Sequence, residues 1–148
     1  MLQGMTRDEF RAVVEKMRAS HPVWFDLPSD EPPSQDEIDE IEQQLNVTLP
    51  PDFVWFLKEY GGGDFAFATI YSADRGSRSH LLRRQEDVQP SDFVAVTDNG
   101  AGDLFGFRAD DGVLGDEIHF FDHETETVSI AADDFLTFVK DRAFRGNA

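Results

Sequence analysis

Apolar residues recur every three or four positions in several stretches of the first 60 residues, a pattern typical of amphipathic helices. The first predicted helix begins with a capping box at residues 6–9 (Thr-Arg-Asp-Glu) and runs to about Ser20. The second begins with an equivalent box at residues 34–37 (Ser-Gln-Asp-Glu). Asn46 suits a left-handed C-terminal cap for this second helix.

A third helix is predicted from the proline pair at 50–51, because proline is tolerated in the first helical turn. The three glycines at 61–63 end this helix. Residues 23–33 contain three prolines and are expected to form an extended linker. Within it, Trp24 and Phe25 are interpreted either as anchors that hold the first helix down or as an exposed aromatic patch.

Beyond residue 63 the pattern changes to the alternation that is typical of short strands. Five strands are predicted, at residues 65–70, 93–97, 104–107, 117–121 and 127–130. A polar loop is expected at 72–90, and Asp133 or Asp134 is expected to cap a final helix. Runs of strands joined by turns form antiparallel sheets, so we predict an α+β fold. It would have a mostly antiparallel sheet of about five short strands, flanked by N-terminal helices and a C-terminal helix, in a single domain over residues 1–148.

The strong acidity of the chain bears most on its function. It has 30 Asp and Glu residues and 13 Lys and Arg residues, for a net charge of −17. No base occurs between Arg18 and Lys58 or between Arg108 and Lys140. Such a chain repels nucleic acids and anionic lipid surfaces, so neither is an expected partner. Four arginines gather instead in the 72–90 loop: Arg75, Arg78, Arg83 and Arg84.

Other compositional features exclude further classes of function. The chain has no cysteine, which rules out disulfides, thiolate metal sites and a cysteine nucleophile. The N-terminal residues do not resemble a secretory signal, and no apolar run approaches the ~18 residues that a membrane helix needs. We therefore expect a cytoplasmic protein.

The region around the second and third predicted helices has a recognisable pattern, an acidic helix followed by a Leu-Pro block and a glycine run. A turn with Gly and Asp and a short C-terminal helix come later. The chain resembles the SUKH superfamily, also called the SMI1/KNR4 family, over residues 34–140. The matching segments are Ile38, Ile41, Leu45, Leu49-Pro50-Pro51-Asp52-Phe53, Phe56-Leu57, Tyr60-Gly61-Gly62-Gly63, residues 99–104 and residues 132–139.

This resemblance implies an α+β fold and, for bacterial members, an immunity protein that binds and neutralises a toxin domain. Fungal relatives imply an alternative, a regulatory or scaffolding module that binds other proteins. The family has no shared catalytic residues to carry over, and its partners vary. We therefore expect a binding protein without enzymatic activity or a cofactor.

The sequence contains few candidate motifs for metal or phosphate binding. His119 and His123 have the spacing of helical zinc ligands but fall on a predicted strand and the turn after it. Residues 98–103 lack the ligand pattern of a calcium loop, and residues 61–64 lack the lysine of a phosphate loop. His21 and His80 are expected at the surface. No metal site is predicted.

Acidic side chains remain as the candidate binding residues. One interpretation is that they are solvated faces that keep the protein soluble. The other is a surface for a basic partner, because complementary charge speeds association and rejects wrong partners. On this second interpretation the candidates are Asp36, Glu37, Asp39, Glu40 and Glu42 of the second helix, with Asp98, Asp103, Asp110, Asp111 and Asp116.

Overall fold

The computed structural model describes residues 4–86, 88 and 91–145. The helices in this part of the chain are α1 (Arg7–Ser20), the 3₁₀ helix η1 (Pro22–Phe25), α2 (Gln35–Leu45), α3 (Pro51–Tyr60), α4 (Leu81–Gln85) and α5 (Phe135–Phe144). The strands are β1 (Gly63–Phe65), β2 (Ala68–Ile70), β3 (Phe93–Asp98), β4 (Leu104–Asp110), β5 (Val113–Leu114), β6 (Ile118–Asp122) and β7 (Thr127–Ala132). None of the helices within these ranges has the length and apolar character to cross a membrane.

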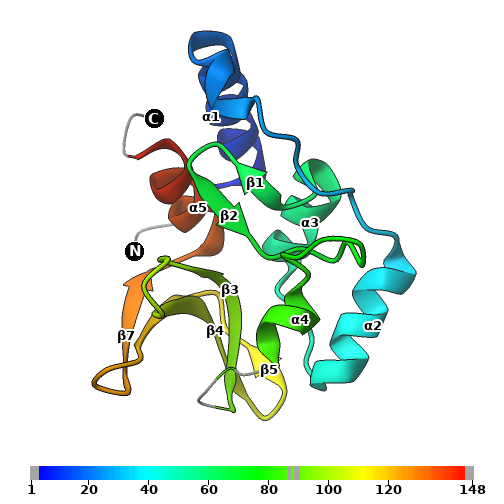
Figure 1. Ribbon diagram of the computed structural model, residues 1–148, viewed down its shortest axis with the longest axis vertical. Helices are drawn as coiled ribbons and strands as arrows, with labels where there is room; N and C mark the ends of the chain where they lie inside the picture. Colours follow the sequence, from blue (N-terminus) through cyan, green and yellow to red (C-terminus); the bar gives the residue numbers. More distant parts are fainter. Residues whose placement is uncertain (1–3, 87, 89–90, 146–148) are drawn as a thin grey trace.

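The larger sheet has the strand order β3-β4-β6-β7, and β5 pairs with β4 beside this path. All of these pairings are antiparallel. A separate antiparallel pair, β1 and β2, lies between the helices and β3 (Figure 1). The sheet occupies the lower part of Figure 1, and α1 lies at the opposite end of the molecule. The predicted α+β fold, with its mostly antiparallel sheet of five strands, N-terminal helices and a C-terminal helix, is confirmed.

Phenylalanines form the centre of the core. Phe53 and Phe56 of α3 are fully buried and contact Phe135 of α5 edge to face, at centroid distances of 5.2 and 5.5 Å. Phe53 also contacts Phe107 of β4, and Phe56 contacts Phe65 of β1. Helix α3 therefore joins the sheet to both α5 and the small hairpin. Burying each such ring contributes on the order of 1.5–3 kcal/mol.

The predicted helix starts are confirmed, because they depend on local hydrogen bonds. Thr6 and Glu9 form a reciprocal capping box at the start of α1. Ser34 and Glu37 form the second box at the start of α2. Asn46 takes the left-handed conformation (φ 55°) that ends α2. Asp134, rather than Asp133, caps α5 by accepting from the Thr137 amide at 3.0 Å.

The prediction of one strand over residues 65–70 is wrong, because the chain reverses there. Ala66 adopts φ 51°, and Phe65 pairs with Ala68 across the turn between β1 and β2. The amide of Phe67 donates to the carbonyl oxygen of Ala143 at 3.0 Å. This bond to α5 fixes a turn that the alternation of side chains does not reveal.

The 72–90 segment, predicted as a polar loop, contains helix α4, while residues 87, 89 and 90 lie outside the described part. Leu81 of α4 is fully buried, which gives this short helix a place in the core. His80 occupies the N-cap position of α4 without a side-chain hydrogen bond to the helix, and it is only 8% exposed, so its predicted surface position is wrong. Burial lowers the pKa of His80, since the charged imidazolium loses water.

The linker aromatics serve as anchors. Phe25 contacts Phe65 and Phe144, and Trp24 contacts Phe67 at 4.9 Å. The predicted extended linker therefore begins with a 3₁₀ turn that fastens the end of α1 to β1 and α5. Trp55 is partly buried at the edge of the core, where its ring contacts Phe10 and Tyr60.

Candidate protein-binding surface

Helix α2 presents the first group of candidate acids, and the structure gives several of them internal partners. Glu37 closes the capping box by accepting from the Ser34 amide at 3.0 Å. Glu42 accepts from the Leu49 amide at 2.7 Å, which fixes the turn after the helix. Asp39 accepts from the Gln35 side chain at 2.9 Å. Asp36 is exposed near the start of the helix.

Arg75 neutralises part of this helix, a contact that the sequence did not reveal. Its guanidinium group donates to both carboxylate oxygens of Glu40, at 3.1 and 3.2 Å, and lies 3.9 Å from Glu37. The hydrogen bonds from Arg75 lower the pKa of Glu40. Glu40 and Glu37 are therefore poorer candidates for binding a basic partner than Asp36 and Asp39 are. The two members of the pair lie 35 residues apart in the chain, so local pattern carries no signal for it.

A groove of about 580 Å³ lies where the end of α2 meets the turn between β4 and β5. The Thr48 amide holds the two segments together by donating to the Gly112 carbonyl oxygen at 3.2 Å. Three candidate acids line this groove: Asp39 and Glu42 from α2 and Asp111 from the turn. We call this feature the acidic groove. It brings together residues from two acidic segments that are about 70 positions apart in the sequence.

The wall of the acidic groove also has an apolar part. Val113 lines it and is 65% exposed, so an apolar contact is available beside the carboxylates. Asp110 is exposed in the same β4–β5 hairpin. Carboxylates placed in this way accept charge-assisted hydrogen bonds from Lys or Arg side chains. The groove thus has the chemistry to receive a basic side chain.

Asp98, the last residue of β3, and Asp103, in the turn that follows, lie elsewhere, and both have internal partners. Asp98 accepts from the Tyr71 hydroxyl at 2.6 Å and from the Gly100 amide at 2.8 Å. Burial, followed by the bond to Asp98, raises the pKa of Tyr71. Asp103 accepts from the Asn99 side chain at 2.9 Å. These two acids hold the turn in shape.

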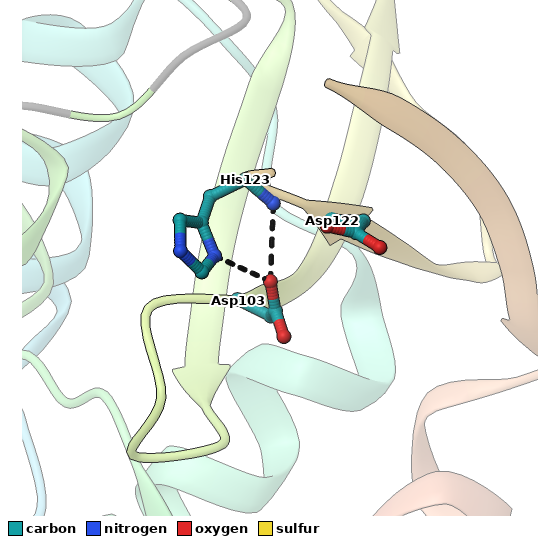
Figure 2. Close-up of side chains that lie close together, drawn as sticks. All are labelled: Asp103, Asp122 and His123. Atoms are coloured by element: carbon teal, nitrogen blue, oxygen red, sulfur yellow. Dashed lines mark hydrogen bonds and ion pairs between the residues drawn. The ribbon is translucent and has the colours of Figure 1, made fainter. Parts of the chain in front are cut away.

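Asp103 also ties its turn to the next one, because it accepts from the His123 amide at 3.0 Å and contacts His123 Nδ1 at 2.6 Å (Figure 2). Hydrogen bonds from Asn99 and then from His123 lower the pKa of Asp103. The same contact with Asp103 raises the pKa of His123. The pair joins the β3–β4 turn to the β6–β7 turn.

Asp122 approaches this pair, and together Asp103, Asp122 and His123 have potential ligand atoms within 4.8 Å of one another. It is the one such metal-ligand group in the described ranges, and His119 is outside it. Three of the four carboxylate oxygens already accept hydrogen bonds: Asp122 Oδ1 accepts from the amides of Glu124 and Thr125, at 2.9 and 3.3 Å, and both oxygens of Asp103 have the partners given above. These contacts support a structural role for the cluster in shaping two turns.

Asp116 lies in a further groove, with Asp52, Asp133 and Asp134. Asp52 pairs with Arg7 at 2.8 Å, and Asp134 caps α5. The ten candidate acids therefore do not form one continuous face. The structure groups Asp39, Glu42 and Asp111, with Asp110 close by, and separates Asp98, Asp103 and Asp116 from them.

Comparison with known proteins gives a family match. The family model described as SMI1-KNR4 cell-wall, SUKH_6, matches residues 35–139, which is more than two-thirds of the chain. The match begins at the first residue of α2 and includes α3, both sheets and the start of α5. The curated proteins contain no match to the chain. By the extent of the family match, this chain belongs to the SUKH (SMI1/KNR4) family.

Proposed function

We propose that this protein is an immunity protein that binds a bacterial toxin domain and blocks it, without catalysing a reaction. Membership of the SUKH family supports a role of this kind. The observation that carries the proposal is the acidic groove, in which Asp39, Glu42 and Asp111 converge from separate segments. A net charge of −17 adds long-range attraction for a basic partner.

The charge of the groove indicates the class of toxin. A nuclease domain needs a basic surface to bind the phosphate backbone of its substrate. An acidic protein that covers this surface blocks the substrate by both shape and charge. The partner is therefore proposed to be a toxin with a basic active-site surface, such as a nuclease, encountered in the cytoplasm.

Co-expression tests this proposal. The protein is tagged and produced together with the product of the neighbouring gene, and the complex is isolated at low and at moderate salt. We expect a stable complex. We also expect that producing this protein restores growth to cells in which the product of the neighbouring gene is toxic. Failure to form a complex together with failure to restore growth would refute the immunity role.

A second candidate function follows from the description of the matching family model, which refers to the cell wall. On that basis the protein would be a regulatory or scaffolding module that binds a protein of its own cell. The neighbouring genes distinguish the two candidates, since an adjacent toxin gene supports immunity. Its absence would favour regulation.

A further inference from the structure

Strand β7 forms an open edge of the larger sheet. One side pairs with β6, from Ile118 opposite Ala132 to Asp122 opposite Thr127. No strand or loop of the described residues pairs with its other side. Figure 1 shows β7 at the outer border of the sheet. The outward amide and carbonyl groups of β7 are therefore available to another chain.

The side chains of β7 lack the usual protection of such an edge, although a register shift leaves Ala131 without a partner in β6. Natural edge strands often carry a lysine or other charge, or a proline, that prevents a further strand from pairing. The six residues of β7 are Thr-Val-Ser-Ile-Ala-Ala, with neither a charge nor a proline. Ile130 is 59% exposed in the middle of the strand. This edge is thus chemically suited to strand addition.

Space for the side chains of an added strand lies beside this edge. A groove of about 500 Å³ separates β7 from α5. Ile130, Ala131 and Ala132 form its apolar wall, and Asp133, Thr137 and Asp141 form its polar wall. Strand addition obtains affinity from backbone hydrogen bonds and specificity from such side-chain pockets.

The charges around β7 select its occupant. Glu126 precedes the strand, Asp133 follows it, and Asp141 lies across the groove. A second copy paired antiparallel would place Glu126 near Asp133 of its neighbour, and two chains of net charge −17 would repel each other. An extended segment that carries Lys or Arg meets these carboxylates favourably.

We propose that β7 accepts an extended, basic segment of the partner protein as an additional strand of the sheet. The identification of this partner with a toxin rests on the proposed function, whereas the edge itself does not. Binding would then combine two contacts, the added strand at β7 and basic side chains in the acidic groove.

Hydrogen–deuterium exchange measured by mass spectrometry tests the edge directly. The probe is a nine-residue peptide in which valine alternates with lysine, and the control peptide has glutamate in place of lysine. We expect the lysine peptide to slow exchange at residues 127–132 and the glutamate peptide to leave it unchanged. Absence of protection by the lysine peptide, or equal protection by both peptides, would overturn the proposal.

Proline substitutions supply a matched pair of variants. Ser129 and Ile130 are consecutive, opposite Phe120 and His119, so their amides point to opposite sides of β7. The two variants are Ser129→Pro and Ile130→Pro. One of them removes an amide that donates to β6, and the other removes an amide that points away from β6, toward the open edge. Thermal melting identifies the outward one, because it keeps the higher melting temperature. That variant is expected to bind the lysine peptide at least about tenfold more weakly than the wild type. Unchanged affinity would contradict the proposal.

The toxin domain encoded by the neighbouring gene is examined by the same exchange measurement. Protection of residues 127–132 in that complex is the expected result. A complex that leaves these amides unprotected would overturn strand addition and retain the immunity role. If no toxin complex forms, the immunity role fails, and the peptide experiment still decides whether β7 accepts a strand.

Discussion

Replacing Gly61 with alanine should disrupt the packing of the segment that leads into α2. Gly61 has φ 87°, and a Cβ at this position would overlap the carbonyl oxygen of Asp30 and lie 2.9 Å from its carbonyl carbon. The backbone there is fixed, since the Asp30 amide donates to Gly62 at 2.9 Å. The Asp30 side chain also accepts from the Ser72 hydroxyl at 2.6 Å. The contact therefore cannot relax without breaking hydrogen bonds.

Gly100 provides the matched control for this substitution. It has a similar φ of 77°, but a Cβ there would meet no atom within 4 Å. Gly100→Ala therefore costs the left-handed conformation alone, about 1–2 kcal/mol. Gly61→Ala adds an overpacking cost of about 1–3 kcal/mol. The difference between the two variants reports the contact with Asp30 together with the backbone cost of the φ 87°, ψ −32° conformation of Gly61.

Urea unfolding and thermal melting measure this difference. For a chain of this length, each kcal/mol lowers the melting temperature by about 2–4 °C. Gly61→Ala is thus expected to melt about 2–12 °C below Gly100→Ala. Equal melting temperatures for the two variants would refute the close packing of the 61–63 turn against Asp30.

Four further variants test the core, the helix start and the paired turns. Phe56→Ala should cost about 3–5 kcal/mol in urea unfolding, because the ring is fully buried among other aromatics, and a cost near zero would contradict that packing. Ser34→Ala should cost about 1 kcal/mol by removing the cap of α2, and Ser34→Asp should restore most of the loss. In an NMR titration, His123 should show a pKa above 6.5, and Asp103→Asn should return it toward 6.5. Because the raised pKa of His123 stabilises the fold fully below pH 6.5 and less as the pH rises through the folded pKa, the stability advantage over Asp103→Asn should shrink between pH 6 and pH 9. A constant advantage would contradict the ionic contribution.

Helix starts and the fold class could be predicted from the sequence because they depend on local contacts. The capping box of Ser34 and Glu37 involves residues three positions apart, and its pattern is visible in the sequence. The reversal at Ala66 was not predictable in this way. It depends on a hydrogen bond from Phe67 to Ala143, some 76 residues away. Side-chain alternation continues through the turn and gives no sign of it.

The same limit applies to the candidate site. Acidity of α2 and of the 110–116 segment was evident, but their meeting depends on the hydrogen bond between Thr48 and Gly112. The neutralisation of Glu40 by Arg75 is likewise a contact between distant segments. Composition identified which side chains are available for a basic partner. Only the tertiary contacts distinguish Asp39, at the groove, from acids that hold turns.

The dissociation constant of the complex with the neighbouring-gene toxin domain tests the central claim most directly. It is measured at two salt concentrations for the wild type, for Asp39→Lys with Asp111→Lys, and for the control Asp8→Lys with Glu15→Lys on α1, which makes the same charge change away from the groove (Figure 1). We expect the groove variant to bind at least about tenfold more weakly, with a flatter salt dependence, and the control to stay close to the wild type. Equal weakening by both double variants, or no weakening by either, would contradict binding through the acidic groove.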